Sequence, residues 1–421
     1  MRSTFAGLFC VALVSTPAAN ASPSPAPPTA AVSASPSPTF APIIVPPRDA
    51  PAVRATTPPI VPAYTASTPV PPENVWLGPS TSIVLSMAIH DNRPYTQALI
   101  DGHPATLVID TGVVDTMVDP AALDDTNETK VSLQIGELRF PKLPFVRIGV
   151  RAYAERELGA PADGIIGRDL LARYAVQLDF PGHQMTVLRD AHAMSPPAQG
   201  AVTLPLRLLG GVPAIAASLD GQQSRWFALA TGTNGQVALE PSRGRMAMLG
   251  RNEHSIPYQD VSIAGANGGL LVRARTLNVG GLTFNQPLVA LLDRGRFGGN
   301  DITGSLGATL LSGVNLTIDE PSSTATIVAP PGATLARFYE PSGIGLEMRH
   351  GTILVRNVVP GTPADEHLRP GDEIVSINGL APATLDFARS LLDGNPGTKA
   401  SIVYRRWHMT HSVILTLHVI V

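Results

Sequence analysis

The chain has 421 residues, of which 44% are hydrophobic and 15% are charged, and its formal net charge is -3. A chain of this length provides for roughly two or three domains rather than one. The negative balance and the lack of a lysine or arginine cluster exclude the basic surface that a nucleic-acid partner requires, so we expect no nucleic-acid binding.

The first residues have the pattern of a cleavable signal peptide, predicted over 1–21. Arg2 precedes an apolar run over 5–14, which is shorter than the about 20 residues that cross a bilayer. The Ala-Asn-Ala sequence at 19–21 fits a cleavage site, so the expected location is periplasmic or secreted, with no membrane span in the mature chain. An uncleaved anchor is the alternative. The only cysteine, Cys10, lies inside this segment, so the mature chain would have no disulfide.

Residues 22–78 are dominated by proline, alanine, serine and threonine, which predicts a disordered linker. From residue 82 the pattern changes to short β-type runs, with Asp101-Gly102 as a strong hairpin-turn signal. No long helix pattern occurs before the candidate helix over 168–175. This predicts a mostly β body with a few short helices.

An internal repeat organises that body. Four segments recur in the same order, 107–112 as 227–232, 133–140 as 277–284, 164–171 as 304–311, and 178–188 as 318–328. The repeat predicts two homologous lobes, over 82–192 and 198–330.

The sequence Asp110-Thr111-Gly112 follows an apolar run, as a catalytic aspartate loop would. An aspartic-peptidase site needs two facing carboxylates that share one proton across a water molecule. With the downstream Asp-Gly-Ile-Ile-Gly at 163–167, the chain resembles the retropepsin-like and pepsin-like aspartic peptidases over roughly 82–330. The resemblance implies two acid-protease-like β-barrel lobes. It also implies Asp110 as the catalytic carboxylate, with Thr111, Gly112, Thr231 and Gly232 supporting the two loops. A β-barrel with a chance turn sequence is the alternative.

The second lobe departs from this family because Ala230 stands where the second aspartate is expected. The nearest acid upstream, Asp220, belongs to a segment that matches the Asp101-Gly102 turn, so it is a poor substitute. Two explanations stay open. Lobe one could pair with lobe one of a second copy in a homodimer and rebuild the dyad. Alternatively, the protein is a non-catalytic relative that still binds extended peptides.

Lobe two is longer than lobe one over about 253–273, where two β-type runs flank the glycine-rich sequence at 265–269. A hairpin with a glycine-rich tip suits a flap that closes over bound peptide, with Tyr258 as a candidate flap aromatic. A mobile surface loop is the alternative.

Residues 336–421 resemble a PDZ domain. Gly343, Ile344, Gly345 and Leu346 look like the loop that binds a peptide carboxylate, the segment 368–379 is a close match to the family, and 384–392 has helical spacing. The resemblance implies a PDZ-like α+β domain after the two lobes and a peptide ligand for it.

We expect no metal and no cofactor, because the ten histidines are scattered without a zinc-site spacing. The function that these patterns predict is an exported aspartic-type endopeptidase that acts on extended peptide segments of a peptide or protein substrate. A catalytically degenerate peptide-binding scaffold is the alternative, and Ala230 is the residue that favours it.

Overall fold

The computed structural model describes residues 73–124, 127, 129–189, 200–241, 254–263, 265–297, 301–329 and 342–421. The predicted signal peptide and nearly all of the predicted linker lie outside these ranges. Within them, no helix has the length and the apolar character needed to cross a membrane.

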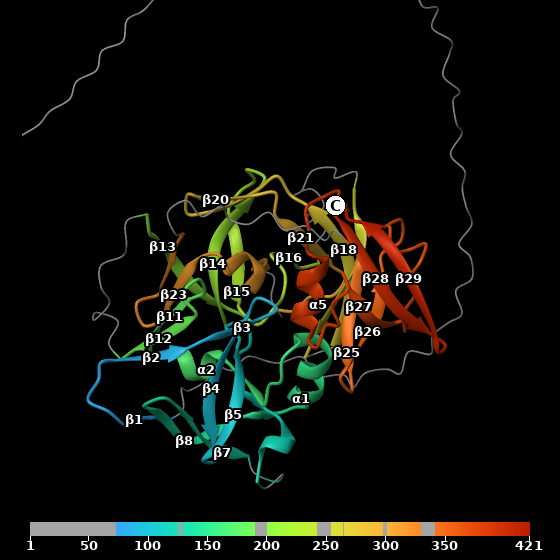
Figure 1. Ribbon diagram of the computed structural model, residues 1–421. Coiled ribbons are helices and arrows are strands. Elements are labelled where there is room, and N and C mark those ends of the chain that lie inside the picture. The colour runs from blue at the N-terminus through green and yellow to red at the C-terminus, as the bar shows by residue number, and fades with distance from the viewer. Residues whose placement is uncertain are drawn as a thin grey trace, which may run out of the picture. The chain divides into compact units, whose positions relative to one another are not determined.

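Lobe one contains a nine-stranded sheet in the order β1-β8-β7-β4-β5-β10-β6-β9, with β3 beside β4 (Figure 1). Its elements are β1 (Val75–Trp76), β3 (Ala88–His90), β4 (Arg93–Ile100), β5 (His103–Ile109), β6 (Met117–Val118), η1 (Pro120–Ala122), β7 (Lys130–Ile135), β8 (Leu138–Pro144), β9 (Val146–Arg147), α1 (Val150–Tyr153), the π-helical η2 (Ala154–Leu158), β10 (Gly164–Ile166) and α2 (Arg168–Leu171). Asp101 and Gly102 connect β4 to β5 with positive φ values of 50° and 87°, as the predicted two-residue hairpin requires.

A second sheet of fifteen strands runs through both lobes, in the order β17-β18-β21-β16-β22-β15-β14-β13-β24-β23-β11-β12-β2, with β19 beside β14 and β20 beside β19. Lobe one supplies β2 (Ser82–Ser86), β11 (Ala175–Asp179) and β12 (Gln184–Leu188). Lobe two supplies β13 (Val202–Leu209), β14 (Val212–Leu219), β15 (Arg225–Ala230), β16 (Val237–Leu239), β17 (Ile256–Ser262), β18 (Gly265–Arg273), β19 (Thr276–Val279), β20 (Leu282–Asn285), β21 (Leu288–Leu292), β22 (Ile302–Gly307), α4 (Ala308–Leu311), β23 (Asn315–Asp319) and β24 (Thr324–Val328).

The lobes join where β11 pairs antiparallel with β23, which is its counterpart in the repeat. At the centre of this pairing, Gln177 lies opposite Thr317, and these two are equivalent positions of the repeated segments. An antiparallel pair of equivalent strands centred on equivalent residues is the signature of a pseudo-two-fold axis. One hydrophobic core extends across both lobes and includes Ile109 and Leu229, which precede the two repeated loops.

Three local features differ from the sequence-based expectation. The helix predicted over 168–175 ends at Leu171, and Ala175 already begins β11. Helices α1 and η2 were not predicted, because a segment this short shows little periodicity. The predicted hairpin over 253–273 is confirmed as β17 and β18, but the glycines expected at its tip lie in β18. There a Cβ on Gly269 would lie 2.1 Å from the Leu291 carbonyl oxygen, so glycine permits a close strand approach.

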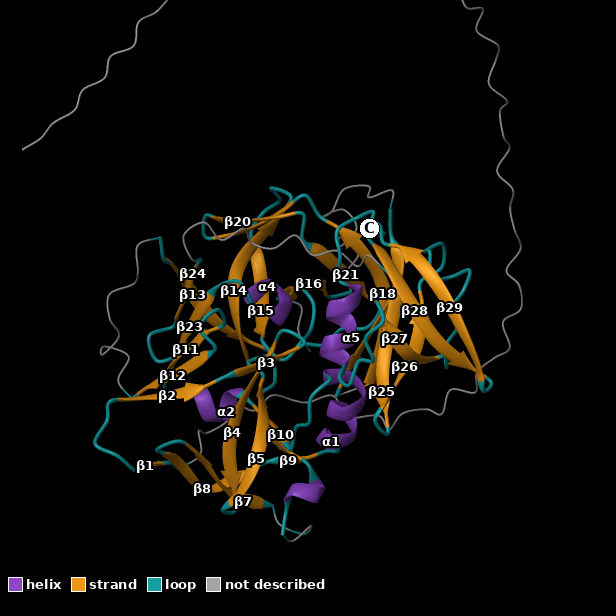
Figure 2. Ribbon diagram, in the orientation of Figure 1, coloured by secondary structure: helices purple, strands orange, loops and turns teal. Residues whose placement is uncertain are grey.

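The C-terminal part is a five-stranded sheet with its own hydrophobic core. Its elements are β25 (Ile344–Arg349), β26 (Thr352–Val358), β27 (Glu373–Ile377), α5 (Leu385–Leu392), β28 (Lys399–Arg406) and β29 (Met409–Thr416). Helix α5 matches the predicted helix and begins after Thr384, whose side chain accepts from the Phe387 N–H. In Figure 2 this helix lies on the side of the sheet that faces the lobes. The predicted fold class, mostly β with two repeated lobes followed by an α+β domain, is confirmed.

Candidate functional site

Asp110 lies in the loop after β5, at the junction of the two lobes. Its N–H donates to the Ile166 carbonyl oxygen at 3.0 Å, which ties the loop to β10. Its Oδ1 accepts from the Gly112 N–H at 2.8 Å and from the Gly232 N–H at 3.1 Å. The carboxylate is therefore held by amides from both lobes and faces the equivalent loop of lobe two.

Thr111 and Thr231 lock the two loops together in a reciprocal arrangement. The Thr111 hydroxyl donates to the Leu229 carbonyl oxygen at 2.7 Å, and the Thr231 hydroxyl donates to the Ile109 carbonyl oxygen at 2.8 Å. In addition, the Thr111 N–H donates to the Thr231 hydroxyl oxygen at 3.1 Å. Both threonines are buried, so each hydroxyl satisfies a carbonyl of the opposite lobe that water does not reach.

Ala230 occupies in lobe two the position that Asp110 occupies in lobe one. A Cβ on Gly232 would lie 2.5 Å from the Asp110 Cβ, and a Cβ on Gly112 would lie 2.8 Å from the Ala230 Cβ. These matched clashes show that each loop glycine makes room for the first side-chain atom of the opposite loop. The methyl group of Ala230 therefore stands where a second carboxylate would begin.

The pKa of the Asp110 carboxyl group is raised above its ordinary value. Burial raises its pKa, while the amide bonds from Gly112 and Gly232 and the guanidinium groups of Arg93 and Arg296 act in the opposite direction. Arg93 is itself buried, and its Nε donates to the Gly232 carbonyl oxygen at 2.9 Å. The site thus combines one acid of raised pKa with a fixed cation nearby.

Asp220 does not complete the site. Its Oδ1 accepts from the N–H groups of Arg275 and Thr276, and it holds positive φ in the turn after β14. Asp101 does the same in lobe one, where its Oδ1 accepts from the Ser132 N–H. The two aspartates are equivalent turn residues. Across the described ranges, no group of three or more His, Cys, Asp or Glu residues is placed to hold a metal ion.

The four residues predicted to bind a peptide carboxylate lie together at the start of β25. Gly343 has a positive φ of 71°, and the Ser342 hydroxyl accepts from the Ile344 N–H at 3.2 Å. The β25–β26 register shifts between Gly345 and Leu346, which takes backbone groups out of the regular ladder. This loop faces a cavity of about 560 Å³ whose lining includes α5, the β17–β18 hairpin and the loop before β16. Asp110 does not contribute to that lining.

The groove between β25 and α5 has the carboxylate loop at one end, and lobe one covers its other end. Segment η2 packs against β25, and Arg356 pairs with the buried Glu157 of η2. Burial raises the pKa of Glu157, although Arg356 and Arg156 oppose this. A Cβ on Gly159 would lie 3.0 Å from the Leu385 Cβ, so the chain after η2 runs close against the first turn of α5. A strand added along this part of β25 would meet η2.

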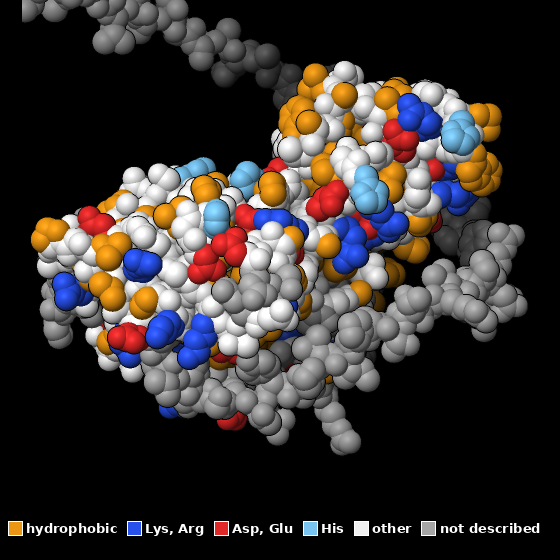
Figure 3. Space-filling model, turned by 90° about the horizontal axis from the view of Figure 1, so that it is seen from below, with side chains coloured by type: hydrophobic (Ala, Val, Ile, Leu, Met, Phe, Trp, Pro, Cys, Tyr) orange, Lys and Arg blue, Asp and Glu red, His pale blue; other side chains and the backbone are white. Residues whose placement is uncertain are grey.

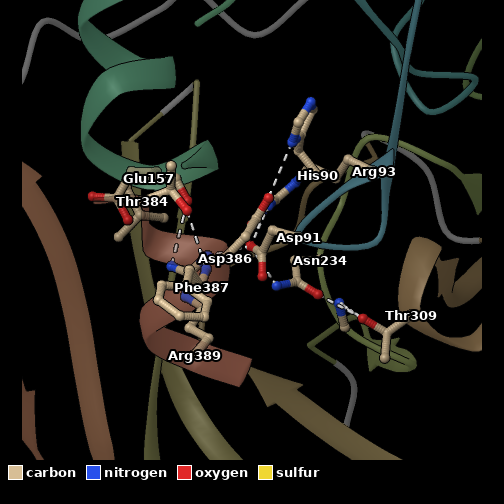
Figure 4. Close-up of polar contacts among 12 residues, drawn as sticks. His90, Asp91, Arg93, Glu157, Asn234, Thr309, Thr384, Asp386, Phe387 and Arg389 are labelled. Atoms are coloured by element: carbon tan, nitrogen blue, oxygen red, sulfur yellow. Dashed lines mark hydrogen bonds and ion pairs between the residues drawn. The ribbon is translucent and has the colours of Figure 1, made fainter. Parts of the chain in front are cut away.

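A polar cluster around Asp91 connects all three parts of the molecule. The Asp91 Oδ2 lies 2.6 Å from Nη1 of both Arg93 and Arg389, and it accepts from the Asn234 Nδ2 at 2.7 Å (Figure 4). His90 adds a contact of 3.1 Å between its Nδ1 and Asp386 of α5. On the face shown in Figure 3, acidic and basic side chains are likewise intermixed. Sequence reasoning missed this cluster, and the only local signal was a tight turn at Asp91, which has positive φ.

Comparison with known proteins agrees with the C-terminal part of this geometry. Residues 343–417 match the family model of the PDZ domain. The structure of an aspartic proteinase from Irpex lacteus is similar with 11% sequence identity and a TM-score of 0.38, covering 61% of this chain and 100% of that chain. No curated protein matches the chain. The segment from Gly343 to Leu417 is a PDZ domain.

Proposed function

We propose that this protein is an exported peptide-binding protein, whose PDZ domain takes the ligand and whose two lobes serve as a scaffold that does not hydrolyse it. The observation that carries the proposal is the pairing of the two loops, in which Asp110 meets Ala230. A second observation supports it, because the PDZ loop opens to a cavity and Asp110 does not line that cavity.

A lone carboxylate lacks half of the chemistry that peptide hydrolysis by this route needs. One carboxylate must take a proton from water while its partner donates a proton or hydrogen bond to the scissile carbonyl. Ala230 offers neither. The nearby Arg93 is held by Asp91 and by a carbonyl oxygen, and a guanidinium group cannot act as the missing proton carrier.

The open end of the groove indicates which ligand fits. PDZ domains bind peptides, commonly as a strand added beside a sheet edge, with alternate side chains in pockets. Here the carboxylate loop at 342–346 is open to the cavity, whereas η2 covers β25 near the first turn of α5. The ligand that fits is therefore a short peptide end with a free carboxylate rather than a long internal segment.

An aspartic-type endopeptidase is the second candidate, and the complete threonine interlock with the raised pKa of Asp110 favours it. A dyad rebuilt from two copies would require the Thr231 loop to leave lobe one. It would also disturb the β11–β23 pairing that joins the lobes. Sedimentation of the purified chain tests that version, because a strict monomer rules it out.

Two assays on the full chain separate the candidates. A mixed set of fluorogenic peptides, assayed between about pH 3 and 7, tests hydrolysis, with Asp110→Asn as the control. Cleavage that Asp110→Asn abolishes would establish the peptidase and overturn the scaffold proposal. Calorimetric titration with a library of peptides tests binding, each made with a free carboxylate and with an amide end. The scaffold proposal expects each peptide that binds to do so more tightly with a free carboxylate than with an amide end.

The PDZ loop offers a matched pair of variants for the binding assay. Gly343 and Gly351 have similar positive φ values of 71° and 75°. A Cβ on Gly343 would lie 2.4 Å from the Thr362 Oγ1, whereas a Cβ on Gly351 meets nothing within 4 Å. Gly343→Ala is expected to abolish peptide binding, and Gly351→Ala, with the same backbone strain, is expected to preserve it. Equal binding by both variants would place the ligand outside this loop.

A further inference from the structure

Lobe two has a second apolar face, on the side of its sheet that points away from the shared core. Four strands contribute one residue each to a straight row across this face, because Ile256 pairs with Leu271, Leu271 with Ala290, and Ala290 with Ala238. These side chains belong to one apolar cluster that is separate from the main core. The two alanines are adjacent at one end of the row, and all four residues line the cavity.

The end of the described chain lies on this face. Leu417 is buried in the PDZ core and is held by backbone bonds to Thr398 and Gly397. Beyond it, the chain has no regular secondary structure, and Ile420 reaches the cavity lining while Val421 packs into the apolar cluster of lobe two. A run of only four residues therefore connects the PDZ core to lobe two.

One directional polar contact accompanies this packing. The Arg273 Nε donates to the backbone oxygen of Val421 at 2.8 Å, and the Arg273 Nη1 donates to the Gln286 carbonyl oxygen at 2.7 Å. The guanidinium group is thus anchored on its own lobe and presents a donor to a main-chain oxygen. A donor to main-chain oxygen beside an apolar row is what recognises an extended peptide without reading its polar side chains.

We propose that this row across β17, β18, β21 and β16, together with Arg273, is a second peptide-binding site that takes short extended segments with aliphatic side chains, and that Ile420 and Val421 are its internal ligand. The Ile-Val sequence of these two residues defines the class of ligand, because β-branched residues favour the extended backbone and bury aliphatic surface. The carboxylate loop of the PDZ domain lines the same cavity, but this site is made of other residues and goes beyond the proposed function.

The tether makes the internal ligand a strong competitor. A segment held by a linker of a few residues acts at an effective concentration of about 1 mM. An external peptide with the same intrinsic affinity must therefore approach that concentration to displace it. Release of the segment would expose the site, and it would also remove the contact between the end of the PDZ domain and lobe two.

Fluorescence anisotropy with a labelled synthetic peptide tests the site. The probe is Thr-Leu-His-Val-Ile-Val, the sequence of 416–421, with an amidated end so that carboxylate recognition by the PDZ loop cannot contribute. The full chain carrying Ile420→Asp and Val421→Asp releases the segment, because two charges do not stay on an apolar face. This variant is expected to bind the probe at least about tenfold more tightly than the unmodified chain.

Two further variants keep the test decisive. Val419 is 43% exposed, so Val419→Asp adds charge to the same segment without removing a buried contact, and it is expected to bind the probe as weakly as the unmodified chain. Arg273→Gln, added to the released variant, is expected to weaken binding about tenfold through loss of a charged hydrogen bond. Equal affinity in the unmodified and released chains would overturn the proposal, as would binding that is indifferent to Arg273.

Discussion

Lobe one and lobe two present equivalent loops to each other, with equivalent threonine hydrogen bonds and equivalent glycine contacts. The Thr111 and Thr231 hydroxyls reach the opposite main chain at 2.7 and 2.8 Å, so these two hydrogen bonds are nearly equal in length. The acid is not symmetric, because only lobe one has it at this position. The difference teaches that the threonine interlock between the two loops forms without a carboxylate pair.

Restoring the missing acid is the change with the largest expected effect. Ala230→Asp places a second carboxylate where the Ala230 methyl group now faces the Gly112 loop. We expect a chain with no detectable hydrolysis to gain peptidase activity of about 10²–10⁴ over background, the usual contribution of a positioned acid or base. Two close carboxylates share a proton, so the rate should peak at acidic pH. Fluorogenic peptide cleavage across a pH series measures it.

Ala230→Asn is the matched control for this change, because it has nearly the same shape as Asp and cannot share a proton. Ala230→Asp combined with Asp110→Asn should be equally inactive, since both carboxylates are needed. If Ala230→Asp folds with an unchanged melting temperature but cleaves nothing, the geometric equivalence of the loops does not extend to chemistry.

The lobes differ again where α2 and α4 begin. Arg168 of α2 makes a bidentate pair with Glu320, at 3.0 and 2.9 Å from its Nε and 2.8 Å from its Nη2, and both side chains are buried. The equivalent positions of the repeat are Ala308 and Phe180, which are apolar and buried. Arg168→Ala leaves a buried carboxylate without a cation, so the free energy of unfolding should fall by about 3–5 kcal/mol in urea titration.

Adding Glu320→Phe to Arg168→Ala tests whether the two halves are interchangeable here. This double variant has alanine and phenylalanine at the two positions of the ion pair, as the equivalent apolar site of the repeat has. It should recover most of the lost stability, because replacing a whole buried ion pair is far cheaper than removing one member. A double variant no more stable than Arg168→Ala would show that the two sites are not equivalent in packing.

The repeat explains why so much of the lobe architecture could be predicted from the sequence. From the sequence alone, the matching segments identified Asp110, the equivalent position Ala230, which has no carboxyl group, and the equivalent turn residues. The groove contacts could not be found in this way. Asp91 and Arg389 are separated by most of the described chain, and Glu157 lies in a helical turn too short to show a period. Contacts between unlike domains leave no pattern in a single sequence, because each side is an ordinary surface until the other packs on it.

A third difference between the lobes depends on pH. Asp169 of α2 is buried and accepts from the Thr116 hydroxyl at 2.8 Å, whereas its counterpart in lobe two is the neutral Thr309. Burial raises the pKa of Asp169 to about 6, and the bonds from Thr116 only partly oppose this. Between about pH 4 and 6 the folded state therefore holds more protons than the unfolded state, so the free energy of unfolding should fall as pH rises through this window.

The fall attributable to Asp169 should be about 3 kcal/mol at most, since one pKa unit corresponds to about 1.4 kcal/mol. Asp169→Asn keeps the shape and removes the titration. The difference between the two stability profiles, measured by urea unfolding at each pH, should therefore decline from pH 4 to 6 and then level off. Parallel profiles would mean that Asp169 titrates at an ordinary pKa.

The smallest expected effects concern the interlock itself, where the lobes should behave alike. Thr111→Val and Thr231→Val each leave one buried carbonyl oxygen of the opposite lobe without its hydrogen-bond donor. Each should therefore lower the free energy of unfolding by about 1–2 kcal/mol. The double variant should cost less than the sum, because the two hydroxyl oxygens lie 3.4 Å apart and share partners. Thr203→Val is the control, since Thr203 contacts Thr326 at 2.9 Å in an exposed pair and should change little. If Thr111→Val and Thr231→Val lowered the free energy of unfolding by clearly different amounts, the two lobes would not contribute equally to the interlock.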